Sequence, residues 1–378
     1  MSLVRSKSGS RRGQMGCTVV VGGQYGSEGK GKLVALLSAS HEEPWVVRCG
    51  GPNSGHTITR DGGHLVLRQV PAAALHPASV LCLAAGCAID EQVLLDELNL
   101  LAIPRERIIV DPRAVIIVPS DREAEKPCVE TIGSTSSGTN SAWVRRMSRQ
   151  HDILLAGTSA SLLERVRVEP LAPLLHQTLD NRGAVIVEGT QGFGLSLFHG
   201  FDYPFVTGRD TTAAGFITEV GLSPLQVEHI VMVIRTFPIR VGGNSGPLSN
   251  EITWEEIQEI SGAPDVNAEY TSVTKRLRRV ARFDMDSVKL ACKYNRPTSL
   301  AVMGLDRLDH ANYGLRDPGL LTEKAWEFIR RLQRETGVPI EWAGTGFHTE
   351  EAIQLPLPIQ IHGSSERARD AVDRRHIA

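Results

Sequence analysis

The stretch VVVGGQYGSEGKGKL, from Val19 to Leu33, constrains the fold of this chain more than any other. Three valines lead into a turn with glycines at positions 22, 23, 26, 29 and 31, and a helix-forming run follows. Glycines let a backbone approach an anion closely, and the free N–H groups of a following helix attract negative charge. Five glycines in ten residues would cost too much chain entropy for an ordinary turn. The stretch therefore predicts a strand, a phosphate-binding loop and a helix, with Lys30 and Lys32 adding positive charge.

Two nucleotide-binding fingerprints can be compared with this loop. The GxGxxG pattern of dinucleotide-binding enzymes is absent at every register, which argues against a nicotinamide dehydrogenase. Gly26, Gly31 and Lys32 match the start of a P-loop, but Leu33 replaces the Ser or Thr that would hold Mg²⁺. The loop thus resembles phosphate-binding loops in general without matching either standard motif.

Apolar runs of strand length recur along the chain and are mostly continuous, as in strands buried on both faces of a sheet. They begin at Cys17, Trp45, Ser79, Ala114, Ala184, His229 and Ser299. Helical stretches lie between them and begin at Asp90, Thr253, Asp286 and Thr322. The last has a Thr cap, a Glu in its first turn and a Gly stop. This alternation predicts an α/β fold with a large, mainly parallel central sheet flanked by helices.

Residues 1–16 differ from the rest of the chain, because they are rich in Ser, Gly, Arg and Lys and offer almost nothing to bury. They lack the apolar core of a secretory signal. We predict a disordered basic tail, with Met15 as an alternative start and nucleic-acid contact as a secondary interpretation. We treat residues 17–378 as one catalytic domain, since no repeat or convincing linker divides them.

Charge and composition exclude several classes of protein. The formal net charge of −2 provides no global basic field for nucleic acid. No apolar run reaches the roughly 18–20 residues of a membrane helix. The six cysteines are scattered without a CxxC pair, which argues against a disulfide framework or a zinc site. We therefore expect a cytoplasmic protein, in a host cytoplasm if the gene is viral, that binds neither membrane nor nucleic acid.

Two further stretches carry polar groups whose role the residues alone leave open. In VVRCGGPNSGHTI, Asn53, His56 and Thr57 lie in a Gly-rich bend after a strand. His56 alone would more often be a structural histidine, but beside a phosphate loop it is a candidate acid or cation for a moving phosphoryl group. The basic run TKRLRR from Thr274 can be a solvated helix face, a nucleic-acid patch or a substrate loop.

Several motifs resemble those of adenylosuccinate synthetases. GGQYGSEGKGK, GGPNSGHT, VEGTQGFGLSLFHGFDYPFVTGRDTTAAG and TKRLRRVARFD occur in that family's order over most of residues 17–284, and LAVMGLD and ETGVPIEWAGTGFHTE extend the resemblance to about residue 350. It implies the family's P-loop-NTPase-like fold, a homodimer and Mg²⁺ as cofactor. It also implies a two-step ligase reaction: a nucleoside triphosphate, normally GTP, phosphorylates the 6-oxygen of a purine nucleoside monophosphate, normally IMP, and the amine of L-aspartate displaces that phosphate.

The resemblance carries the family's site residues onto this chain motif by motif. Those implied for the triphosphate are Glu28, Gly29, Lys30, Gly31, Lys32, Thr57, Asp306 and Gly346. Those implied for the purine monophosphate are Ser27, Asn53, Ser134, Thr135, Gln191, Thr207, Arg276 and, from a neighbouring subunit, Arg149, for which Arg145 or Arg146 could substitute. Those implied for aspartate are Thr274, Arg276 and Arg278. Mg²⁺ is assigned to Ser27 and Gly55, and catalysis to Ser27, Lys30 and His56.

Ser27 departs from the family motif, because it falls on the family's catalytic aspartate. That aspartate takes the N1 proton from the purine and coordinates Mg²⁺, whereas a serine hydroxyl has far too high a pKa to act as this base. The same exchange marks a phage-associated branch of the family that uses dGMP and makes N6-succino-2-amino-2'-deoxyadenylate, a precursor of 2-aminoadenine in DNA. The resemblance therefore implies dGMP as the acceptor. An ordinary IMP-dependent synthase and a non-catalytic nucleotide-binding homologue are the alternatives.

Gly304 is a second departure from the family pattern. Asp306 matches the aspartate that reads the guanine of GTP, but the lysine that normally lies two residues before it is missing. The loss implies weaker selection of GTP, so that ATP or dATP becomes a possible triphosphate beside GTP.

Overall fold

The first strand, β1 (Gly16–Gly22), is covered on both faces in the computed structural model, which describes residues 16–60, 63–271 and 275–356. Val19, Val20 and Val21 each have no exposed surface. Because successive side chains of a strand point to opposite faces, β1 must lie inside a sheet with packing on either side. The tail predicted for residues 1–16 lies outside the described residues apart from Gly16, which begins β1.

A ten-stranded sheet contains β1 near its middle, in the order β17-β16-β15-β11-β1-β10-β2-β5-β7-β9. Every neighbouring pair is parallel except β16–β17. Its other strands are β2 (Trp45–Arg48), β5 (Val80–Leu83), β7 (Ile108–Val110), β9 (Arg167–Val168), β10 (Ala184–Glu188), β11 (Val227–Arg235), β15 (Ser299–Met303), β16 (Ile340–Gly344) and β17 (Ala352–Gln354). The predicted fold class, a large and mainly parallel sheet, is confirmed.

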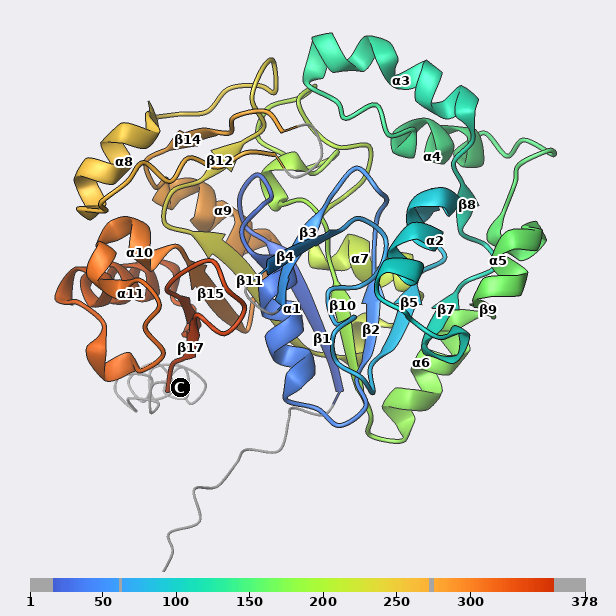
Figure 1. The fold of residues 1–378 in the computed structure, drawn as a ribbon, viewed down its shortest axis with the longest axis horizontal. Helices are drawn as coiled ribbons and strands as arrows, with labels where there is room; N and C mark the ends of the chain where they lie inside the picture. Colours follow the sequence, from blue (N-terminus) through green and yellow to red (C-terminus); the bar gives the residue numbers. More distant parts are fainter. Residues whose placement is uncertain (1–15, 61–62, 272–274, 357–378) are drawn as a thin grey trace, which may run out of the picture.

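Helices cover both faces of this sheet. Figure 1 shows α1 (Lys30–Ala39) in front of the strands and α7 (Ala213–Val220) and α9 (Met285–Asn295) behind them. The remaining helices are α2 (Glu91–Leu100), α3 (Pro119–Ile132), α4 (Thr139–Met147), α5 (Ala160–Arg165), α6 (Leu171–Asp180), α8 (Trp254–Ser261), α10 (Leu305–Leu308) and α11 (Glu323–Thr336). None of the helices within the described residues is long and apolar enough to cross a membrane.

Most predicted elements are confirmed, and one strand is not. The runs from Cys17, Trp45, Ser79, Ala184, His229 and Ser299 form β1, β2, β5, β10, β11 and β15, and the four predicted helices form α2, α8, α9 and α11. The run from Ala114 forms only β8 (Val115–Ile116), which pairs with β6 (Ala88–Ile89) outside the main sheet. Pro119 ends this run, because it occupies the first position of α3.

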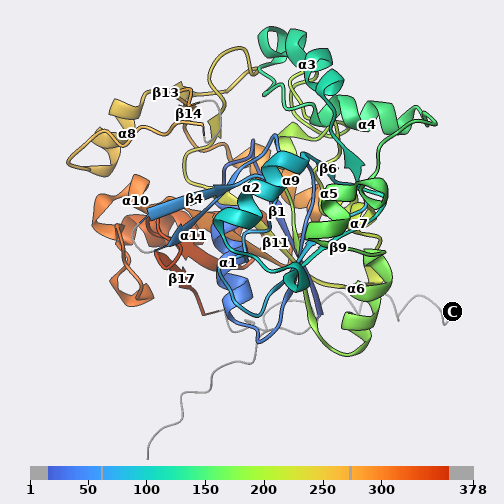
Figure 2. The same ribbon diagram turned by 45° about the vertical axis from the view of Figure 1, so that its right-hand side comes forward.

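Two small substructures stand beyond the carboxyl ends of the parallel strands. One is the sheet of β12 (Ile239–Arg240), β13 (Glu251–Ile252) and β14 (Arg279–Ala281) with α8, and the other is the pair α3 and α4. Figures 1 and 2 both show them at the top of the molecule, apart from each other. The hairpin of β3 (His56–Arg60) and β4 (Gly63–Leu67) lies in front of the sheet in Figure 1. The loops that follow β1, β2, β10, β11 and β15 therefore open into one shared region, where parallel α/β sheets bind their ligands.

Replacing Thr322 by Ala should lower the free energy of unfolding by about 1 kcal/mol, because the Thr322 hydroxyl accepts a hydrogen bond from the Ala325 N–H and caps α11. The measurement is the urea midpoint followed by circular dichroism. Thr322→Ser keeps the hydroxyl and is the matched control. Equal midpoints for all three proteins would show that this cap does not stabilise the fold.

Candidate active site

Glu28 shapes the glycine-rich loop from inside. Its carboxylate is buried, and Oε1 accepts hydrogen bonds from the N–H groups of Gln24 at 3.1 Å and Gly26 at 2.8 Å. Oε2 accepts from Lys30 Nζ at 2.6 Å. A Cβ on Gly192 would lie 2.4 Å from Glu28 Oε1, so glycine is required where the loop after β10 passes this carboxylate. Glu28 therefore holds the loop together, and any contact that it makes with a triphosphate must come from its backbone.

Helix α1 begins inside the loop and leaves its first N–H groups free of side-chain caps. Its N-cap is Gly29 in the left-handed conformation, with φ of 100°, and no side chain caps the helix. Uncapped N–H groups at a helix start are suited to bind phosphate oxygens. A Cβ on Gly31 would lie 2.8 Å from the Cβ of His56, so this glycine lets the second polar stretch approach the loop.

The two lysines of the loop have different surroundings. Lys32 Nζ donates to the carbonyl oxygens of Gly346 at 2.9 Å and Glu351 at 2.7 Å. Burial lowers the pKa of Lys32 to about 8, against the opposing charge of Glu351. Lys32 thus ties the loop to the end of the described chain, whereas Lys30 is bound only within the loop and lies near enough to His56 to act on its charge.

His56 belongs to a buried polar triad with Arg48 and Glu188. Glu188 Oε1 is bonded to His56 Nδ1 and accepts from Arg48 Nη1 at 3.0 Å, and Glu188 Oε2 accepts from the Ala72 N–H at 2.8 Å. Burial, followed by the charge of Arg48, lowers the pKa of His56 to about 4, although Glu188 opposes the shift. The imidazole is therefore neutral at pH 7 until a negative ligand arrives. With Nδ1 bonded to Glu188, Nε2 is the atom left to meet that ligand.

Buried polar atoms without hydrogen-bond partners gather around the same edge of the sheet. Within the described residues they include Asn53 Oδ1, His56 Nε2, Arg209 Nη1 and Arg235 Nε, while Trp342 Nε1 lies away from this edge on β16. Such atoms are rare in folded proteins, because leaving one unpaired costs about 1–3 kcal/mol. Asn53 follows β2 and Arg235 ends β11, so two of these unpaired atoms belong to residues at the carboxyl ends of parallel strands.

Ser27 presents a free hydroxyl at the tip of the loop. It is exposed and has a left-handed backbone, with φ of 58°. Its carbonyl oxygen accepts from Arg235 Nη1 at 3.2 Å, while its hydroxyl makes no hydrogen bond to any described residue. The Ser27 hydroxyl is therefore available to hydrogen-bond a ligand.

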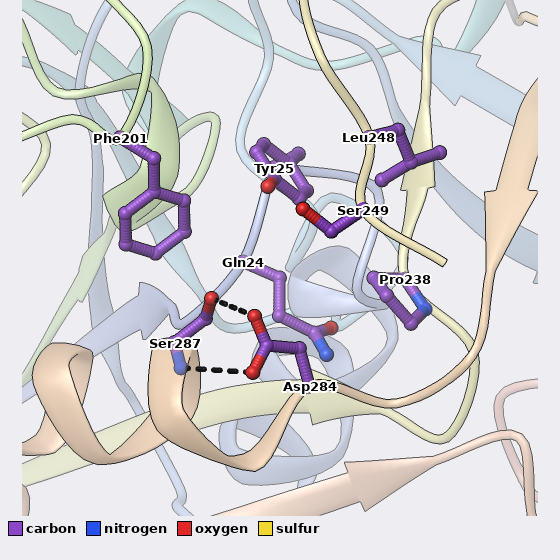
Figure 3. A pocket seen from close by; sticks show the side chains of 8 residues that line it. All are labelled: Gln24, Tyr25, Phe201, Pro238, Leu248, Ser249, Asp284 and Ser287. Carbon is purple, nitrogen blue, oxygen red and sulfur yellow. Dashed lines mark hydrogen bonds between the residues drawn. The ribbon is translucent and has the colours of Figure 1, made fainter. Parts of the chain in front are cut away.

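A small pocket lies behind the loop, on the side of Gln24 and Tyr25 (Figure 3). It is lined by Gln24, Tyr25, Phe201, Pro238, Leu248, Ser249, Asp284 and Ser287. Asp284 accepts from the Ser287 N–H at 3.3 Å and caps α9, and the amide of Gln24 is bonded to the backbone of Arg235. Because these polar groups already have partners, the pocket supports the back of the loop and offers little to a reacting group.

Apart from Ser27 and the arginines, the residues implied for the monophosphate come from three segments. Asn53 follows β2, and Gln191 follows β10 with φ of 56°. A Cβ on Gly26 would lie 3.5 Å from the Cα of Gln191, so this residue lies against the phosphate loop. Thr207 donates its N–H to Leu195 at 2.8 Å. Ser134 and Thr135 lie between α3 and α4, where Ser134 Oγ accepts from the Ser136 N–H at 3.2 Å.

Three arginines in or near α4 are candidates for contacting the purine monophosphate of a neighbouring subunit. Arg145 is bound to both carboxylate oxygens of Asp121, and Arg146 donates to the Ala85 carbonyl at 2.5 Å. Arg149 is exposed, and its guanidinium makes no hydrogen bond or ion pair within the described part of the chain. Of the three, Arg149 is the one left free to reach another subunit.

Of the three residues implied for aspartate, the structure describes Arg276 and Arg278. Thr274 lies outside the described residues. Arg276 is exposed and its guanidinium has no described partner, whereas Arg278 Nη1 contacts Glu269 Oε2 at 3.1 Å. Glu269 also contacts Arg235, so the arginine segment is joined to the end of β11.

Gly304 has a backbone reason to be glycine. Its φ is 82°, and its carbonyl accepts from Thr236 Oγ1 at 2.6 Å. A Cβ there would lie 3.0 Å from the same Thr236 oxygen. The left-handed conformation and the close hydroxyl both disfavour a lysine at this position. Asp306 follows in α10, where burial raises the pKa of its carboxyl group against the charge of Arg307.

The described residues offer few ligands to a metal ion. No group of three or more His, Cys, Asp or Glu side chains that could hold a metal occurs among them. Ser27 and Gly55 can supply only neutral oxygens, a hydroxyl and a carbonyl. This set fits a Mg²⁺ ion that takes most of its ligands from reactant phosphates and water, as Mg²⁺ commonly does.

Sequence reasoning missed several charged residues of the site. Arg48, Glu188 and Arg235 each end an apolar strand at its carboxyl end, and all three are buried. A charged residue that closes a continuous apolar strand is an available signal, because burying it demands a partner. Arg209 carries no such signal; it packs over Phe216 and pairs with Glu219.

Comparisons with known proteins point to one family. The family model described as "Adenylosuccinate synthetase" matches residues 19–156 and 155–313. The adenylosuccinate synthetase of Methanocaldococcus jannaschii is 37% identical over 90% of this chain and 96% of its own. That of Archaeoglobus fulgidus is 35% identical over 90% of this chain and 98% of its own.

Two solved structures are similar to the whole described fold. Cyanophage S-2L succinoaminodeoxyadenylate synthetase, bound to dGMP and dATP, is 28% identical, has a TM-score of 0.75 and covers 90% of this chain and 96% of its own. The fully ligated adenylosuccinate synthetase of Plasmodium falciparum has a TM-score of 0.79, covers 91% of this chain and 100% of its own, and is 19% identical, which supports the fold alone.

Replacing Lys30 by Met should lower kcat by about 100-fold or more, because a buried cation near His56 would stabilise charge on a transferring phosphoryl group. The single variant should also lose stability, by about 3–5 kcal/mol, since it leaves the Glu28 carboxylate buried and unpaired. The double variant Glu28→Gln/Lys30→Met separates the two effects. It should recover the urea midpoint without recovering phosphate release, and recovery of both would remove Lys30 from the chemistry.

Proposed function

Because this chain belongs to the adenylosuccinate synthetase family, whose members are ligases that join aspartate to a purine nucleotide, we propose that its acceptor is dGMP. The product would be N6-succino-2-amino-2'-deoxyadenylate. The observation that carries this proposal is the free hydroxyl of Ser27 at a loop position where the family has a carboxylate base. The reaction class follows from the family, and the choice of acceptor is the proposal.

The chemistry of the 6-oxygen connects Ser27 to the acceptor. Phosphorylating this oxygen requires negative charge to develop there, so the neighbouring N1 must lose or share a proton. A carboxylate can take that proton and the Ser27 hydroxyl cannot, so in this chain the N1 proton would pass to a reactant phosphate oxygen or to water. A guanine carries a 2-amino group beside N1, which can donate a hydrogen bond to the Ser27 oxygen, whereas a hypoxanthine has only hydrogen there. The loss of one such hydrogen bond costs about 1–3 kcal/mol, or roughly ten- to a hundredfold in rate.

The surrounding groups support the phosphoryl-transfer step. The uncapped start of α1 and Lys30 offer donors and charge to the triphosphate, and Nε2 of His56 offers a third group. A triphosphate beside His56 would raise its pKa, because negative charge favours the imidazolium. Mg²⁺, held by reactant phosphates with help from Gly55 and Ser27, would offset the remaining charge.

IMP is the second candidate acceptor, and the comparisons favour it at least as well. The archaeal relatives at 35–37% identity are adenylosuccinate synthetases, whereas the cyanophage enzyme that binds dGMP is 28% identical. Identity over a whole chain mainly reflects the fold and the shared chemistry, so it weighs less on a choice that one loop position can make.

The remaining parts of the proposal concern the other reactants and the assembly. We assign ATP, dATP or GTP as the triphosphate, because Gly304 gives Asp306 no neighbouring lysine with which to select guanine. Arg149 is assigned to the monophosphate of a neighbouring subunit in a homodimer. The six cysteines are all free thiols, as expected in the reducing cytoplasm.

With equal dGMP and IMP, L-aspartate, Mg²⁺ and ATP or GTP, the enzyme should make an excess of N6-succino-2-amino-2'-deoxyadenylate, counted by product mass. Ser27→Asp should shift the products toward adenylosuccinate, because it restores a carboxylate base beside N1. Ser27→Ala removes the hydroxyl without adding a base and is the control. A clear excess of adenylosuccinate from the wild type would contradict the dGMP proposal. If no phosphate is released with dGMP or with IMP, the protein is a non-catalytic homologue.

Arg276→Lys should raise the KM for aspartate about tenfold while changing the KM for the triphosphate little. Lysine keeps the charge but loses the paired N–H donors that suit a carboxylate. Initial rates at varied aspartate and varied triphosphate measure the two constants. Arg282→Lys is a control, because the Arg282 side chain is exposed and contacts Glu256 at the surface. It should leave the KM for aspartate unchanged. An unaltered aspartate KM in Arg276→Lys would place the aspartate contact elsewhere.

A further inference from the structure

Glu269 is a partly buried residue whose carboxylate contacts three guanidinium groups. It contacts Arg235 Nη1 at 3.1 Å and Nη2 at 2.5 Å, Arg278 Nη1 at 3.1 Å and Arg307 Nη2 at 3.9 Å. The charges of Arg235, Arg278 and Arg307 outweigh burial and lower the pKa of Glu269 to about 2. Glu269 therefore stays ionised throughout the working range of an enzyme.

Arg235 connects this carboxylate to the phosphate loop. Its Nη1 donates to the Ser27 carbonyl at 3.2 Å, and its backbone N–H and carbonyl are both bonded to the side-chain amide of Gln24. Ser27 has a φ of 58°, which a serine seldom adopts without support from its surroundings. The Arg235 guanidinium, fixed at one end by Glu269, supplies such support.

Arg278 connects the same carboxylate to the segment implied for aspartate. The Arg278 N–H donates to the Glu269 carbonyl at 2.8 Å, and the Thr271 N–H donates to the Arg276 carbonyl at 2.8 Å. Residues 269–271 and 275–278 thus run side by side as two paired segments, called here the arginine hairpin. Arg276 lies on this hairpin two residues from Arg278, so the Glu269–Arg278 contact fixes the base from which Arg276 projects.

We propose that Glu269 is a positioning residue that fixes Ser27 and the arginine hairpin relative to each other. It would touch no reactant itself. Its two carboxylate oxygens hold Arg235 on the side of the purine acceptor and Arg278 on the side of aspartate, so one charge sets the separation of two reactants that must meet at C6. This inference rests on the proposed function for the identity of those reactants.

The test is Glu269→Gln, which keeps the size of the side chain and removes its charge. The ratio of the two products from equal dGMP and IMP should move toward one by about three- to tenfold, because Ser27 loses its support, and the KM for aspartate should rise by a similar factor. Both acceptors compete for the same enzyme molecules, so a loss of folded protein leaves their ratio unchanged.

Two further variants sharpen the test. Arg235→Lys keeps the charge but cannot span Glu269 and Ser27, so it should change the product ratio and leave the aspartate KM nearly constant. Asp111→Asn is the matched control. It removes a buried carboxylate that is paired with Arg113 just after β7, four strands away from β1 in the sheet order, and it should change neither quantity.

An unchanged product ratio and an unchanged aspartate KM in soluble Glu269→Gln would overturn the inference. Should that variant fail to fold, an unchanged ratio in Arg235→Lys would overturn the link to Ser27. A different result, a wild type that prefers IMP, would contradict the proposal that dGMP is the acceptor. In that case a ratio that still changes in Glu269→Gln would support the positioning role on its own.

Discussion

The ion pair between Arg48 and Glu188 is the interaction on which the rest of the site depends. It joins the carboxyl ends of β2 and β10, and both side chains are almost completely buried. Taking two charges out of water is costly, so the pair persists only because further bonds satisfy it. The Ser54 carbonyl, the Ala72 N–H and the His56 ring supply those bonds. The loop after β2 is therefore held against the sheet by charge, and His56 is oriented by the same network.

Much of the fold and part of the site could be predicted from the sequence. Continuous apolar runs identified six of the seven expected strands correctly, and the glycine-rich turn predicted where α1 begins. The short strands β7 and β9 have too few residues to show a pattern, and Pro119 cut short the run from Ala114. Some partners of charged groups could not be predicted, because they lie far away along the chain. Lys32 contacts Glu351, 319 residues later.

The fold and the residue at position 27 carry different information about function. The overall fold is shared with the cyanophage enzyme, and the archaeal relative from Methanocaldococcus jannaschii matches this chain over 90% of its length. Ser27 is a local difference in a loop where the charged residues Glu28 and Lys30 are bound to each other. Because Glu28 and Lys30 satisfy each other, a neutral residue at position 27 leaves the architecture of the loop intact. A change at this one position therefore does not require the scaffold around it to change.

The position of β1 between β10 and β11 has a consequence for how the protein is made. The first strand of the chain cannot pair until residues beyond 184 have been synthesised, and its loop is anchored by Arg235 and by the carbonyl of Glu351. Domains emerge from the ribosome beginning with the N-terminus. This chain must keep its N-terminal strand unpaired in the main sheet while about the first half of its 378 residues is translated. A ribosome-bound fragment would consequently have no assembled loop with which to consume nucleotide, and activity would begin only with a nearly finished chain.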